Sequence, residues 1–138
     1  MTDTSVQATR SGQGLLTVMR VLSAIVLLAI AAIHLFLVFD GVGGTLRVLF
    51  ILNVIAAVVL AIGMLVLRGR LLGIASVLSL LFVIASLLAL LLALTVGLFG
   101  IREVWTFTLV PETVVVEAIG IVVLAITTAV SLRRPRTA

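Results

Sequence analysis

The stretch that decides the fold runs from residue 71 to residue 99 and reads LLGIASVLSLLFVIASLLALLLALTVGLF. It carries no charged side chain, and it exceeds the ~20 apolar residues that a helix needs to cross a bilayer. Three other apolar runs are also long enough, so the sequence predicts membrane helices at residues 18–39, 46–67, 71–99 and 113–132. Continuous rather than alternating apolar residues favour helices over a barrel. The predicted fold is an all-α antiparallel bundle of four transmembrane helices.

The composition leads to the same class of protein. Hydrophobic residues make up 64% of the chain and charged residues only 10%, which is too little charge to cover a soluble domain. The absence of cysteine excludes disulfides and thiolate chemistry. No basic patch is interleaved with aromatic residues, so we expect a lipid bilayer and no nucleic acid as the partner.

The flanking segments define the predicted domains. Residues 1–16 are polar and small, and we expect a disordered cytoplasmic N-terminus there. The transmembrane domain covers residues 17–132, and a basic cytoplasmic tail covers residues 133–138. The AIA at residues 29–31 resembles a signal-peptidase site, but the apolar run continues beyond it, so we expect an uncleaved signal anchor.

The arginines predict the orientation, because cytoplasmic loops carry an excess of basic residues. A four-helix topology places most of the arginines on one side: Arg10, Arg20, Arg68, Arg70, Arg133, Arg134 and Arg136. Only Arg47 and Arg102 fall on the other side. We therefore expect a multi-pass membrane protein with both termini in the cytoplasm.

The second outer loop, GIREVWTFTLVPE at residues 100–112, is the longest connection. Trp105 fits an aromatic anchor at the membrane surface. Pro111 and Glu112 suit the first turn of the fourth helix, where proline loses no hydrogen bond and a carboxylate meets the positive end of the helix. Charged candidates near the outer helix ends are Arg47, Arg102, Glu103 and Glu112.

Four polar side chains are predicted to share one layer inside the membrane. His34 lies six residues before Asp40, Asn53 six after Arg47 and Glu117 six after Pro111, which is ~9 Å below each outer helix end. On the third helix, Thr95 lies five residues before Gly100, close to the same depth. Small residues share the helix faces of these side chains, as on close-packed membrane helices. The sequence thus predicts an inward-facing cluster of His34, Asn53, Thr95 and Glu117.

Glu117 needs a means of avoiding the cost of a buried charge, which is about 2.5–3.5 kcal/mol at the bilayer centre. It can be protonated, line a water-filled cleft, or pair with a basic group. His34 is the favoured partner, followed by Arg102 and then Arg47. The alternative is a purely structural cluster, because buried Asn and His often join helices by hydrogen bonds worth about 0.6 kcal/mol.

Enzymatic, metal and haem sites are disfavoured. His34 and Glu117 lack a nucleophile in a recognisable frame, and they supply only two strong metal ligands. The lone histidine would need a second chain to ligate haem from both sides. We therefore predict no catalytic activity and no cofactor.

Several segments resemble a group of small four-helix integral membrane proteins from high-GC bacteria: AAIHLFLVF, LFILNVIAAVVLAIGML, LTVGLFGIRE and VVVEAIGIVVLA. The resemblance covers roughly residues 20–132 and implies the architecture and a place in the bacterial cytoplasmic (inner) membrane, but no activity. Two hypotheses follow from the sequence. The first is an accessory or structural subunit of a membrane complex, and the second is a proton- or cation-coupled carrier of small molecules with Glu117 as the titrating group. A homodimer and a larger complex both stay open.

Overall fold

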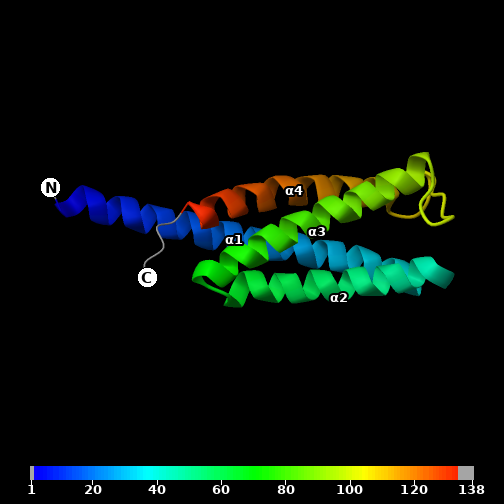
Figure 1. Cartoon of the computed structure of the whole chain (residues 1–138), viewed down its shortest axis with the longest axis horizontal. Coiled ribbons are helices and arrows are strands. Elements are labelled where there is room, and N and C mark those ends of the chain that lie inside the picture. The colour runs from blue at the N-terminus through cyan, green and yellow to red at the C-terminus, as the bar shows by residue number, and fades with distance from the viewer. Residues whose placement is uncertain (1, 134–138) are drawn as a thin grey trace.

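The computed structural model describes residues 2–133 and is entirely helical apart from its connections. The helices are α1 (Thr2–Phe39), α2 (Gly44–Val66), α3 (Gly69–Thr95) and α4 (Val110–Leu132). Each is long and apolar enough to cross a membrane. The α1–α2 and α3–α4 connections lie at one end of the molecule, and the α2–α3 connection lies at the other (Figure 1). We call the first of these the loop end.

The helices pack unevenly. α1 contacts both α2 and α4 extensively, and α3 packs mainly on α4, whereas α2 and α3 make the smallest of these contacts. Figure 1 shows α2 and α3 close together near their short connection and diverging towards the loop end. Because α2 and α3 diverge, their backbones do not pack closely towards the loop end, and side chains line the space between them.

Aliphatic side chains and a methionine fill the interior. Leu27, Ile30, Met64, Val83 and Leu124 are fully buried and belong to one hydrophobic core. Large apolar side chains also cover the outside, including Leu22, Ile25, Val59, Leu81 and Val122. A soluble protein does not expose so much contiguous apolar surface, whereas lipid tails cover such a surface without cost.

The N-terminus differs from its prediction. Residues 1–16 were expected to be disordered, but α1 begins at Thr2. Asp3 lies in its first turn, and the Thr9 and Thr17 hydroxyls each donate to the carbonyl four residues earlier. Extending an existing helix is far easier than nucleating one, so the buried part of α1 supports this polar extension. The predicted basic tail lies outside the described residues, except for Arg133.

Helix α3 ends four residues earlier than predicted, at Thr95 instead of residue 99. Gly97 takes a positive φ of 89°, and the amides of Val96 and Gly97 both donate to the Leu92 carbonyl. This is a typical glycine termination of a helix. The chain then reverses at Phe99 and Gly100, both with positive φ, and the amide of Ile101 donates to the Leu98 carbonyl.

Helix α4 begins earlier than predicted, at Val110 instead of residue 113. Pro111 and Glu112 lie in its first turn, as the sequence indicated. The intervening loop, residues 96–109, is tied back to α3 because the Glu103 amide donates to the Ala93 carbonyl at 3.0 Å. That bond holds the loop over the space between α2 and α3.

Candidate functional site

Glu117 is the centre of the site. Its side chain on α4 is fully buried, with 0% of the residue exposed. The Ser86 hydroxyl on α3 donates to Glu117 Oε1 at 2.6 Å. The second carboxylate oxygen, Oε2, is buried and has no hydrogen-bond partner among the described residues. The carboxylate is therefore held by one oxygen and left with an unused acceptor on the other.

Asn53 completes a chain of hydrogen bonds across three helices. Its Nδ2 group on α2 donates to the Ser86 hydroxyl at 3.0 Å. Since Ser86 has a single proton and gives it to Glu117, the serine oxygen is free to accept from Asn53. The amide oxygen of Asn53, Oδ1, is buried without a partner in the described part of the chain. The chain Asn53–Ser86–Glu117 thus ends in two unpaired acceptors.

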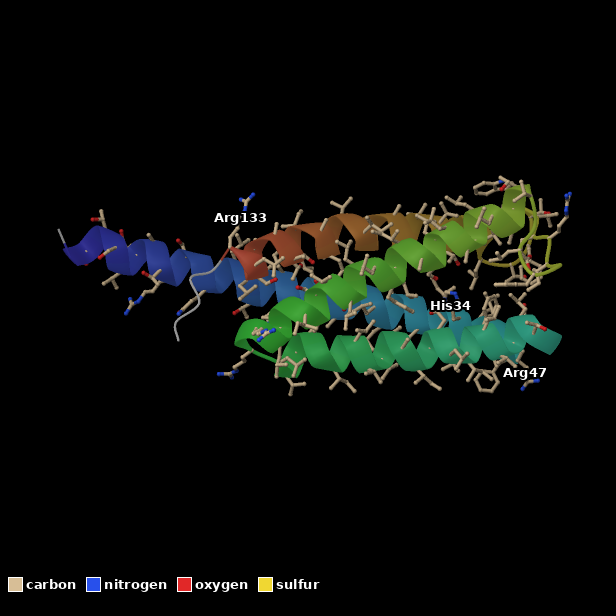
Figure 2. The ribbon with its side chains drawn as sticks, in the orientation of Figure 1. His34, Arg47 and Arg133 are labelled. Carbon is tan, nitrogen blue, oxygen red and sulfur yellow. The ribbon has the colours of Figure 1, made fainter. Side chains whose placement is uncertain are left out.

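His34 lines the same space from α1, but it is bonded to its own helix. Its Nδ1 lies 2.9 Å from the Ile30 carbonyl, which can only accept, so Nδ1 carries a proton. The ring meets Phe50 edge-on, with the two ring centroids 5.0 Å apart. Figure 2 shows His34 inside the bundle, whereas Arg47 and Arg133 point outward at opposite ends of the part where the four helices lie side by side.

These groups face a cavity of about 420 Å³ at the loop end of the bundle. All four helices and the 96–109 loop contribute to its walls, which are mostly apolar. Its polar lining is His34, Asn53, Ser86, Glu103, Thr108, Thr113 and Glu117. Four phenylalanines also line it: Phe50, Phe82, Phe99 and Phe107. The volume is in the range of small-molecule sites, and the mixture of apolar walls with a few polar groups is typical of them.

Three predicted cluster residues therefore meet at the cavity, and the fourth does not. His34, Asn53 and Glu117 all line it. Thr95 is exposed in the last turn of α3, where its hydroxyl donates to the carbonyls of Leu91 and Leu92. Its predicted depth assumed that α3 continued to Gly100. With the helix ending earlier, Ser86 occupies the level of Glu117 instead.

The favoured partner of Glu117 was also wrong. Within residues 2–133, Glu117 is hydrogen-bonded to Ser86 and not to His34, Arg47 or Arg102. The Arg102 side chain lies against Gly97, where a Cβ atom would come 3.3 Å from Arg102 Cγ. A serine was missed because its hydroxyl adds little polarity to an apolar run. Its position three residues before Ala89, on the small-residue stripe of α3, was the only signal.

Of the two acidic outer-loop candidates, one lines the cavity and the other does not. Glu103 lines the cavity, and partial burial raises the pKa of its carboxyl group. Glu112 is exposed in the first turn of α4, away from this cavity. In the part of the chain that the structure describes, no group of three or more His, Cys, Asp or Glu side chains is placed to hold a metal ion.

A second polar layer near the opposite end was not predicted as a site. The Arg20 guanidinium on α1 donates to the carbonyls of Met64, Leu65 and Leu67 at the end of α2, at 2.7–2.9 Å. Nearby, the hydroxyls of Ser23 and Thr127 are 2.8 Å apart in the core between α1 and α4. These groups satisfy one another and the backbone, which is a structural role.

The cavity offers one carboxylate oxygen and one amide oxygen without hydrogen-bond partners among the described residues, set in mostly apolar walls, and these are features of a binding site. Comparison with known proteins found no match: no family model, no curated protein and no solved structure is similar to this chain.

Proposed function

We propose that this chain is a non-enzymatic protein of the bacterial cytoplasmic membrane that binds a small molecule in the cavity at the loop end. Its four helices form an antiparallel bundle with both termini in the cytoplasm, so the cavity lies near the outer face. The arginine distribution supports this orientation, because only Arg47 and Arg102 belong to the loop end.

The buried, half-satisfied carboxylate is the observation that carries the proposal. A structural link between α2, α3 and α4 needs only neutral amide or hydroxyl groups, which cost far less to insert than a glutamate. Glu117 instead keeps Oε2 unpaired beside an apolar space large enough for a ligand. Ionisable residues inside a membrane most often serve function for this reason.

Binding is tested by isothermal titration of the protein in phosphatidylcholine nanodiscs. The two probes are 1-naphthylmethanol and 1-naphthylmethylamine, with empty nanodiscs as the blank. We expect saturable binding of at least one probe, close to one per chain. Ala89→Phe should abolish it, because Ala89 lines the cavity and a phenyl ring would fill part of it.

Ala118→Phe is the matched control, because Ala118 is exposed on α4 and the same side-chain change there leaves the cavity open. Binding equal in the Ala89→Phe and Ala118→Phe proteins would place the probes in the lipid and contradict the proposal. So would heat no greater than that of empty nanodiscs for both probes.

A binding protein without transport activity fits an accessory subunit of a larger membrane complex. Co-purification from the native membrane in a mild detergent is the measurement. We expect a partner chain in fixed ratio to this protein. A strictly monomeric species with no partner would argue against the subunit role while leaving ligand binding intact.

A proton- or cation-coupled carrier is the second candidate, favoured by the position of Glu117 inside a spanning helix. Four helices would have to pair with a second copy to build a pathway. Proteoliposomes loaded with a pH-sensitive dye and exposed to benzylguanidinium, a cation with N–H donors that stays charged at neutral pH, test the coupling. A carrier changes the internal pH, and Glu117→Gln should remove that change; equal signals from the two proteins would rule out the role of Glu117.

A further inference from the structure

With Glu117 ionised, the unpaired atoms at the cavity are all acceptors, and this follows from the direction of the hydrogen-bond chain. Asn53 turns its NH₂ group towards Ser86, which leaves its Oδ1 unused. Ser86 turns its O–H towards Glu117 Oε1, which leaves Oε2 unused. A ligand that satisfies both atoms must bring hydrogen-bond donors, and an acceptor such as a carboxylate or a phosphate would be repelled.

The charge of the lining selects the sign of the ligand. The titratable side chains at the cavity are His34, Glu103 and Glu117. His34 uses its Nδ1 proton on the Ile30 carbonyl, and Arg47 points away from the bundle (Figure 2). Among the described residues no basic side chain is bonded to Glu117. The cavity therefore presents carboxylates without a protein cation, which favours a cationic ligand.

The walls select the body of the ligand. Most of the lining is aliphatic or aromatic, including Phe50 on α2 and Phe82 on α3. Such walls stabilise the apolar part of a ligand by burying it, and their aromatic faces attract a nearby positive charge. A volume of about 420 Å³ accommodates one or two fused rings with a short side arm.

We propose that the cavity recognises an organic ammonium ion, with its N–H groups on Glu117 Oε2 and Asn53 Oδ1 and its apolar body against the phenylalanines. This assignment rests on the proposed function, since it names the class of molecule that the cavity binds. An ammonium group offers several donors and one positive charge, and it thus supplies what both unpaired acceptors lack.

The test compares two ligands of nearly the same shape in the same nanodiscs at pH 7. 1-Naphthylmethylamine is protonated at this pH, whereas 1-naphthylmethanol is neutral. We expect the ammonium ion to bind about 10- to 100-fold more tightly, the range of a charge-assisted hydrogen bond. Glu117→Gln keeps the shape of the side chain and should reduce the ratio of the two affinities to about one.

Glu112→Gln is the matched control, because it makes the same chemical change five residues away on an exposed turn of α4. It should leave the preference for the ammonium ion intact. Asn53→Leu should lower that preference without removing it. If Glu117→Gln, Glu112→Gln and Asn53→Leu all reduced the preference for the ammonium ion equally, a general electrostatic effect would be responsible and the assignment would be overturned.

Equal affinity for the two ligands in the unmodified protein would overturn the ammonium assignment while the binding function stands. Binding of neither ligand would overturn both. Because the unmodified protein already makes this comparison, the assignment stays testable if Glu117→Gln fails to fold.

Discussion

At the scale of single residues, one glycine sets how closely α1 and α4 approach. A Cβ atom on Gly120 would lie 2.6 Å from Val26 Cγ1, well inside van der Waals contact. Val26 is β-branched and stiff, so the overlap must be relieved by moving a helix or straining a rotamer. Gly120 is also close to Val83, so the separation it permits affects α3 as well.

We therefore predict that Gly120→Ala destabilises the bundle by about 1–3 kcal/mol, measured by unfolding in mixed detergent micelles. Gly63→Ala is the control, because a Cβ there meets Leu67 and Ala75 at ordinary distances of 3.5 and 3.8 Å. Gly63→Ala should raise the free energy of unfolding by up to about 1 kcal/mol, because alanine forms helices better than glycine. Equal effects of the two substitutions would refute the close approach.

Ser86 is the second residue whose role is local and specific. Its hydroxyl is shared between Asn53 and Glu117, so removing it leaves a buried carboxylate oxygen without a donor. Ser79, seven residues earlier on α3, is fully buried, whereas Ser86 is half-buried, and the Ser79 hydroxyl donates to the Ala75 carbonyl of its own helix.

We predict that Ser86→Ala costs about 1–3 kcal/mol of unfolding free energy, whereas Ser79→Ala is close to neutral. In a Glu117→Leu background the cost of Ser86→Ala should fall by about 0.5–3 kcal/mol, which a double-mutant cycle measures. Independent effects of Ser86 and Glu117 would show that the hydrogen bond contributes nothing.

At the scale of elements, a side chain from α1 caps the C-terminal end of α2. The last carbonyls of a helix have no partner in that helix and carry partial negative charge. Arg20 supplies donors to three of them, at Met64, Leu65 and Leu67. One planar guanidinium thereby fixes the end of α2 against α1, near the short connection to α3.

Arg20→Met should therefore lower the unfolding free energy by about 1–3 kcal/mol, and Arg20→Lys by less, because lysine keeps the charge but loses the planar fork. Arg70→Met is the control, because Arg70 is exposed in the first turn of α3. This substitution removes one positive charge from the same end of the bundle without removing a helix cap. If Arg70→Met had the same effect as Arg20→Met, general electrostatics and not capping would be responsible.

At the scale of the whole molecule, the proposed orientation places the loop end outside the cell. The chain has no native cysteine, so single cysteines report position without background. We expect Gly43→Cys and Thr106→Cys to react with an impermeant thiol reagent added to intact cells. Arg70→Cys should react only after lysis; Arg70 is the inner position chosen because the neighbouring Gly69 has a φ of +55°, which disfavours a side chain. The reverse labelling would invert the topology.

The sequence by itself determined the helices and the depth of most of the polar layer. Long apolar runs allow only helices in a bilayer, and residue counts from their ends placed His34, Asn53 and Glu117 at one level, where all three line one cavity. Only the tertiary structure decided how those groups pair. The partner of Glu117 depends on how each helix is rotated and where α3 ends, and Gly97 ends it at Thr95. That shift exposes Thr95 and leaves Ser86, whose hydroxyl is nearly invisible in hydropathy, to bridge Asn53 and Glu117.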